Sequence, residues 1–178
     1  MDVLFVQGAG GYDEDSKLAV SLQRALGSSY TVHYPKMPDE DAPVYAAWKA
    51  KILEELALLE GKVILAGHSL GASLLLKVVA EEGLEPAGMF LAAPPYWSKS
   101  DWEVDDYALP EGFASSFPED LPLVFYHSRD DEWVPFAHQA IYAEKLPQAK
   151  IRTFESRGHQ FGDDLSEVAA DIRKIDAA

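Results

Sequence analysis

The sequence predicts an α/β protein in which one mainly parallel sheet lies between two layers of helices. Short apolar segments alternate with longer segments of helical periodicity along the chain, and this alternation is typical of parallel strands joined by right-handed helical crossovers. The apolar segments are continuous, as in VILA at 63–66, which indicates strands covered on both faces. At 178 residues, the chain has the length of a single domain, 1–178.

The first half of the chain is expected to hold strand 3–7, helix 16–26, strand 30–34, helix 43–60 and strand 62–67. Apolar residues recur every three or four positions in each helix, so they share one face. Gly27 and Gly61 are expected to end the two helices. Pro43 suits the first position of the second helix, because that position needs no N–H donor.

The second half continues the alternation with a strongly apolar helix that ends near residue 82. The remaining predicted elements are strand 87–92, strand 121–127, helix 135–146, strand 150–155 and helix 163–175. The connection 94–120 is unusually long, with four prolines and several aromatic residues, Trp102 among them. Two interpretations of this insertion remain open: a functional segment or lid at the rim of a site, or an extra helix packed over an edge of the sheet.

The composition excludes several classes of function. Thirty acidic and 15 basic residues give a formal net charge of −15, so we expect no nucleic-acid partner and no anionic membrane surface. The chain has no cysteine, which excludes disulfides, thiolate metal ligands and a cysteine nucleophile. It begins without a signal-peptide pattern and has no apolar run near the roughly 20 residues that span a bilayer. We expect a cytoplasmic protein, and its oligomeric state stays open.

One motif indicates chemistry: GHSLG, a G-x-S-x-G pattern, at 67–71. It lies between a predicted strand and a predicted helix, the context of a nucleophile elbow, in which a sharp turn lifts a serine onto the edge of the sheet. The helix N-terminus that follows favours negative charge there. Ser69 is therefore the candidate nucleophile, and the alternative is a turn of small residues with an inert serine.

A serine hydroxyl needs an adjacent base, and the chain contains five histidines. His159 is the first candidate, because it follows the last predicted strand and so lies at the same edge of the sheet as Ser69. His127, at the end of the fifth strand, is the competing candidate. The others are expected in a core or surface position (His33), packed at the rim (His68) and solvated on a helix (His138).

Two more groups are needed for acyl transfer. The base needs a carboxylate that fixes its tautomer, and Asp130 and Asp131 both follow the fifth strand. The oxyanion needs backbone N–H donors, for which the amide of Leu70 and the glycine-rich loop 7–11 are candidates. A phosphate cradle is the weaker interpretation of this loop, which has neither the spacing nor the Lys-Ser/Thr pair of nucleotide-binding loops.

Together these motifs resemble the α/β-hydrolase superfamily over essentially the whole chain. The order Ser69, Asp131, His159 is that of the superfamily. DEWVP at 131–135 resembles its acid loop, which selects Asp131 over the neighbouring aspartate, and GHQF at 158–161 resembles its histidine loop.

Loop 7–11 resembles the oxyanion loop of the superfamily, with Gln7 where many members have histidine. The resemblance implies that the backbone amides of Ala9 and Leu70 hold the oxyanion. Because the chain is small, the resemblance within the superfamily is greatest to the compact serine hydrolases typified by retinoblastoma-binding protein nine and YdeN. That group implies a three-layer fold, a six-stranded sheet in the order 2-1-3-4-5-6 and no large cap domain.

The most specific prediction is a carboxylesterase that cleaves small-molecule esters through an acyl-enzyme on Ser69, with no metal and no cofactor. A peptidase or thioesterase acting on a short peptidyl or acyl substrate remains open, as does a hydrolase-fold binding protein with vestigial catalysis. The candidates for substrate contact are Gly8, His68, Tyr96, Trp97 and Trp133. Core packing is the alternative for the three aromatic side chains.

Overall fold

The computed structural model describes residues 1–97 and 105–175. Six strands form one sheet in the order β2-β1-β3-β4-β5-β6, with every neighbouring pair parallel. The strands are β1 (Asp2–Val6), β2 (Thr31–His33), β3 (Ile64–His68), β4 (Gly88–Ala92), β5 (Leu123–Ser128) and β6 (Lys150–Phe154). The predicted fold class and strand order are therefore confirmed.

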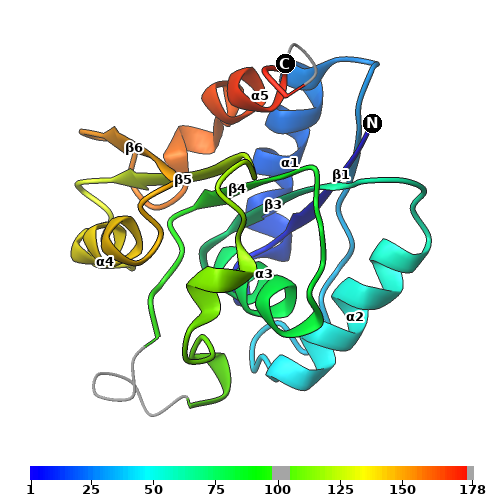
Figure 1. The fold of residues 1–178 in the computed structure, drawn as a ribbon. Helices are drawn as coiled ribbons and strands as arrows, with labels where there is room; N and C mark the ends of the chain where they lie inside the picture. The colour runs from blue at the N-terminus through cyan, green and yellow to red at the C-terminus, as the bar shows by residue number, and fades with distance from the viewer. Residues whose placement is uncertain (98–104, 176–178) are drawn as a thin grey trace.

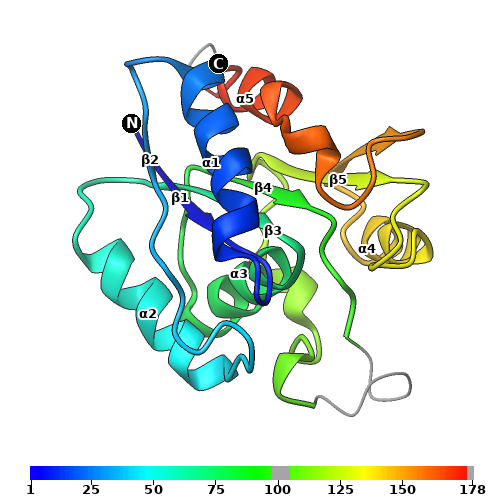
Figure 2. The same cartoon turned by 180° about the vertical axis from the view of Figure 1, so that it is seen from behind.

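Helices cover both faces of the sheet, as Figures 1 and 2 show from opposite sides. One face carries α1 (Tyr12–Leu26) and α5 (Ser166–Ile172), and the other carries α2 (Tyr45–Ala57), α3 (Ser69–Glu82) and α4 (Ala137–Lys145). Among the described residues, no helix has the length and apolar character needed to cross a membrane.

The strand register separates two apolar cores. Leu4, Leu65, Met89 and Leu123 stand side by side across four strands and pack into the core beneath α2, α3 and α4. The next row along the strands, which begins with Phe5, packs into the core beneath α1 and α5. Because side chains alternate along a strand, continuous apolar runs serve both cores at once.

Two helix boundaries in the first half differ from the prediction. The first helix begins at Tyr12, four residues before the predicted start, because the acidic residues 13–15 suit the positive end of the helix dipole. The second begins at Tyr45, so Pro43 precedes it, and it ends at Ala57 before Gly61 is reached.

The predicted helix 163–175 is interrupted. A short 3-10 turn, η3 (Phe161–Asp163), precedes α5. Gly162 in this turn has φ of +61°, which an α-helix cannot accommodate. The chain re-enters a helix at Ser166, whose backbone N–H donates to the Asp164 carboxylate at 2.9 Å. This side-chain acceptor satisfies one N–H of the new helix start.

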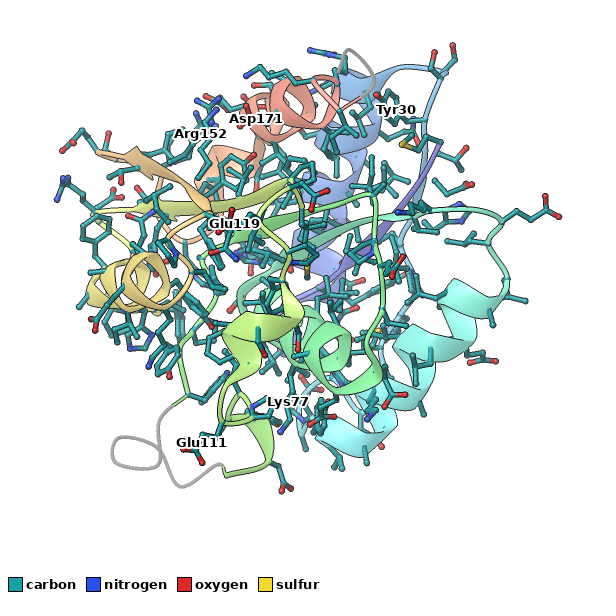
Figure 3. The ribbon with its side chains drawn as sticks, viewed as in Figure 1. Tyr30, Lys77, Glu111, Glu119, Arg152 and Asp171 are labelled. Atoms are coloured by element: carbon teal, nitrogen blue, oxygen red, sulfur yellow. The ribbon has the colours of Figure 1, made fainter. Side chains whose placement is uncertain are left out.

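The insertion 94–120 packs on α3. Its described residues contain two short 3-10 turns, η1 (Asp105–Tyr107) and η2 (Phe113–Ser116), in place of an extra regular helix. The Lys77 ammonium of α3 donates to the backbone carbonyl of Asp106 at 2.6 Å and so holds the insertion (Figure 3). Trp102, with the rest of 98–104, lies outside the described residues.

Candidate active site

Ser69 sits in a strained turn between β3 and α3. Its φ is +51°, a left-handed conformation that non-glycine residues rarely adopt and that often marks functional sites. A Cβ at Gly67 would lie 2.8 Å from the Ala72 Cα, and one at Gly71 would lie 2.2 Å from the Gln7 carbonyl oxygen. Gly67 therefore lets β3 run directly against α3, and Gly71 lets the start of α3 pack against the end of β1.

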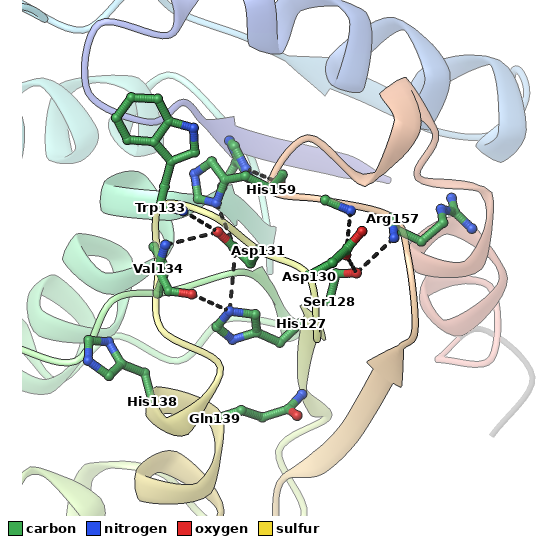
Figure 4. Close-up of polar contacts among 12 residues, drawn as sticks. His127, Ser128, Asp130, Asp131, Trp133, Val134, His138, Gln139, Arg157 and His159 are labelled. Atoms are coloured by element: carbon green, nitrogen blue, oxygen red, sulfur yellow. Dashed lines mark hydrogen bonds and ion pairs between the residues drawn. The ribbon is translucent and has the colours of Figure 1, made fainter.

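The acid loop after β5 brings Asp131 to His159. Figure 4 shows the carboxylate below the imidazole, and the Nδ1 of His159 lies 2.8 Å from the Oδ2 of Asp131. The other carboxylate oxygen accepts the backbone N–H groups of Trp133 and Val134, both at 2.9 Å. The Asp131 side chain is completely buried, so its orientation is fixed by these contacts.

The surroundings of Asp131 keep it ionised. Burial alone would raise the pKa of this carboxyl, but hydrogen bonds from His127, His159 and Val134 outweigh burial and hold the pKa of Asp131 well below its usual range. A carboxylate in this position fixes the tautomer of the imidazole, with its proton on Nδ1 and Nε2 free to act as a base.

The two competing candidates lie in other positions. The Nε2 of His127 lies 3.0 Å from the Val134 carbonyl oxygen and 3.3 Å from Asp131, which places this ring behind the acid loop. The Asp130 carboxylate accepts the Ser128 hydroxyl and the backbone N–H of Gly158, as Figure 4 shows. Asp130 thereby ties the acid loop to the histidine loop.

A cavity of about 510 Å³ opens at the carboxyl ends of the strands. It is lined by eight of the residues singled out from the sequence: Gly8, Ala9, His68, Ser69, Leu70, Trp97, Trp133 and His159. Pro43 and Tyr107 also line it. Pro43 was missed because no local pattern connects the loop before α2 to the site, whereas Tyr107 belongs to the insertion 94–120, for which a place at the rim of a site was one of the two interpretations.

Tyr96 does not have the predicted place in the wall. Its ring packs edge-on against Tyr142 at 5.4 Å between centroids, and its backbone N–H donates to the Nδ1 of His138 at 2.9 Å. The segment therefore anchors to α4, which also corrects the expectation that His138 is only solvated. His33 is partly exposed on the edge strand β2, where its Nε2 lies 2.7 Å from an Asp2 carboxylate oxygen, so of the two expected positions it has the one near the surface.

The loop after β1 is poised beside the serine. A Cβ at Gly8 would lie 3.1 Å from the Cβ of Ser69, a tighter contact than most Cβ atoms make, so a glycine lets the backbone approach the serine without moving it. The amides of Gly8, Gly10 and Gly11 donate to Asp15, Glu40 and Gly8. Among the amides of residues 8–11, all of which the structure describes, this leaves only that of Ala9, an exposed residue, without an acceptor.

Comparison with known proteins agrees with this architecture. A model of the serine hydrolase family matches residues 3–164. The structure is similar to the ydeN gene product of B. subtilis, with a TM-score of 0.82 at 18% identity over 99% of each chain. No curated protein sequence matches significantly.

Two further solved structures share the fold. Est1E from Butyrivibrio proteoclasticus has a TM-score of 0.77 at 15% identity, over 99% of this chain and 88% of Est1E; another Est1E structure contains ferulic acid. SOBER1 from Arabidopsis thaliana has a TM-score of 0.68 at 17% identity over 98% of each chain. With the family model covering most of its length, the chain belongs to the serine hydrolase family, in the compact α/β-hydrolase fold of YdeN.

Proposed function

We propose that the protein is a carboxylesterase that cleaves small esters by acyl transfer. The observation that carries the proposal is the junction of a strained Ser69 and an Asp131-oriented His159 on one cavity. In the first step, Nε2 of His159 removes the hydroxyl proton as the Ser69 oxygen attacks the ester carbonyl carbon. Asp131 stabilises the imidazolium that forms.

The tetrahedral intermediate carries its negative charge on the former carbonyl oxygen. The backbone amides of Ala9, in the loop after β1, and of Leu70, in the first turn of α3, are the donors we assign to this oxygen, because both residues line the cavity beside Ser69. The intermediate collapses when His159 passes its proton to the leaving alcohol. Water, deprotonated by the same imidazole, then attacks the acyl-enzyme and releases the acid and free Ser69.

The cavity favours esters with an apolar group of modest size. Its walls include Pro43, Trp97, Tyr107 and Trp133, side chains that contact flat apolar groups well. Ferulic acid, an aromatic acid, is bound by Est1E, which shares this fold. Small aliphatic and aromatic esters are therefore the substrates to test first.

The test is a substrate panel on wild-type protein and Ser69→Ala. We expect kcat/KM for p-nitrophenyl acetate and butyrate to exceed the values for an acyl-thioester and an aminopeptidase substrate, and Ser69→Ala to lose this activity. A higher value on the thioester or the peptide would reassign the substrate class. Full activity in Ser69→Ala would exclude the mechanism, and a folded wild-type protein inactive on the whole panel would favour a binding role.

A further inference from the structure

A second buried aspartate–histidine pair lies beside the proposed site, and the mechanism does not use it. Asp15 comes from the first turn of α1, and His68 ends β3 directly before Ser69. The Nδ1 of His68 lies 2.9 Å from the Oδ2 of Asp15, and both side chains are almost completely shielded from solvent. An acid and a base buried together in this way need an explanation.

The hydrogen-bond partners determine the charge of this pair. The Nε2 of His68 lies 2.9 Å from the backbone carbonyl oxygen of His159. A carbonyl can only accept, so Nε2 carries a proton. The Oδ2 of Asp15 also accepts the backbone N–H of Gly8 at 2.7 Å, and a second donor on this oxygen favours the carboxylate form, so we place the proton between Oδ2 and Nδ1 on the nitrogen. Both ring nitrogens donate, which makes His68 an imidazolium and Asp15 a carboxylate.

The electrostatic surroundings are consistent with this assignment. Burial disfavours the charged ring, but the charge and hydrogen bond of Asp15 and the His159 carbonyl outweigh burial and raise the pKa of His68. Asp131 also acts in this direction. The other rings that face His68 are His159, at 4.6 Å between centroids, and Phe161.

The pair connects the loops that the proposed chemistry needs. Asp15 holds the amide of Gly8, the neighbour of the oxyanion residue Ala9. His68 holds the backbone of His159 and is covalently joined to Ser69. Two hydrogen bonds and one ion pair therefore fix the oxyanion loop and the histidine loop relative to the nucleophile.

We propose that Asp15 and His68 form a charged positioning pair that sets the distance between the oxyanion loop and the catalytic histidine. This inference rests on the proposed function of Ser69 and His159. The alternative is an ion pair that only stabilises the fold. A positioning pair predicts that removing the charge of Asp15 lowers kcat, whereas a purely stabilising ion pair predicts a loss of stability with kcat unchanged.

Asp15→Asn is the informative variant, because one oxygen of Asp15 now serves two donors. If the asparagine oxygen takes the place of Oδ2, it can still accept the Gly8 N–H. His68 is then neutral, and its single ring proton cannot serve both the asparagine oxygen and the His159 carbonyl. If the amide nitrogen takes that place, the Gly8 N–H loses its acceptor. Either way one connection is lost, and we expect kcat to fall about 10- to 100-fold with KM changed less than about threefold.

Asp171→Asn is the matched control. Asp171 is a buried carboxylate on α5 that pairs with Arg152; Figure 3 labels the two residues close together. It too is expected to lose stability, but its kcat is expected to stay within about twofold of wild type, because the residue lies in another cavity. Thermal unfolding of both variants separates lost stability from lost positioning. Equal kcat values for folded Asp15→Asn and wild type would overturn the proposal.

Nitrogen-15 NMR of the histidine side chains tests the charge without relying on activity. At pH 7, in wild-type protein and in Ser69→Ala, we expect both ring nitrogens of His68 to show the shifts of protonated nitrogens. A neutral His68 would overturn the proposal, even where Asp15→Asn fails to fold. Failure of the hydrolase proposal is recognised separately: Ser69→Ala would keep the wild-type activity, or the folded wild-type protein would be inactive on the whole substrate panel.

Discussion

Replacing Asp131 with asparagine is expected to reverse the tautomer of His159. One carboxylate oxygen accepts two backbone amides, from Trp133 and Val134 at 2.9 Å each, so the amide oxygen of Asp131→Asn has to occupy this place. The amide nitrogen then replaces the oxygen that now accepts Nδ1 of His159. It donates to Nδ1, which moves the ring proton to Nε2, and His159 can no longer accept the proton of Ser69.

The size of the effect follows from this geometry. A base held in the wrong tautomer lowers kcat by about 10⁴, which corresponds to roughly 5.5 kcal/mol of lost transition-state stabilisation. The same amide nitrogen also faces Nε2 of His127, which already donates to the Val134 carbonyl. Because the asparagine nitrogen and Nε2 of His127 are then both donors with no acceptor between them, we expect a further loss of folding stability of about 1–3 kcal/mol.

The assay is hydrolysis of p-nitrophenyl acetate at saturating substrate, with folding monitored by circular dichroism. Asp130→Asn is the control, because the Asp130 carboxylate accepts the Ser128 hydroxyl and the Gly158 amide, whereas the ring of His159 pairs with Asp131. We expect Asp130→Asn to keep kcat within about tenfold of wild type. The reasoning is refuted if folded Asp131→Asn keeps a kcat within about tenfold of wild type, or if Asp130→Asn loses as much activity as Asp131→Asn.

Three other substitutions test the remaining structure. Gly71→Ala would place a Cβ 2.2 Å from the Gln7 carbonyl, so urea unfolding is expected to show a loss of at least about 2 kcal/mol; a loss below about 0.5 kcal/mol would contradict the tight turn. Burial would raise the pKa of Asp171, but Arg152, Lys174 and Tyr126 outweigh it and depress the pKa, so its stabilisation is present above about pH 4 and is lost as pH falls further. The stability difference between Asp171→Asn and wild type should therefore shrink from pH 7 to pH 2, and a constant difference would contradict this ion pairing. Trp133 is 74% exposed at the rim of the cavity; Trp133→Ala is expected to raise KM for aromatic esters by about 3- to 10-fold with little change in Tm, and an unchanged KM would remove it from the substrate contacts.

The layers of the fold and the turn at the candidate nucleophile could be predicted, because each depends on residues that are neighbours in the sequence. The alternation of apolar and helical segments determines the layers, and the motif at 67–71 places a small-residue turn between β3 and α3. The strand order needed the family resemblance, because alternation alone permits several orders of parallel strands. Helix starts were less predictable, because the first turn of α1 is Tyr12 followed by three acidic residues, with no apolar periodicity to mark it.

The contacts around the site depend on residues far apart in the chain. Asp15 and His68 are separated by 53 positions, and nothing near Asp15 distinguishes it from the other 29 acidic residues. Tyr96 was expected in the cavity wall because it is aromatic and lies at the rim. Its position is instead decided by Tyr142 and His138 of α4, a contact that only the folded chain creates.

Labelling with a fluorophosphonate probe is the most direct test of the central claim, that His159 and Asp131 activate Ser69. The account predicts one phosphonate per folded chain, mapped by peptide mass spectrometry to Ser69, with a labelling rate at least about 100-fold lower in His159→Gln. A folded wild-type protein that resists the probe, a label on another residue or an unchanged rate in His159→Gln would contradict it.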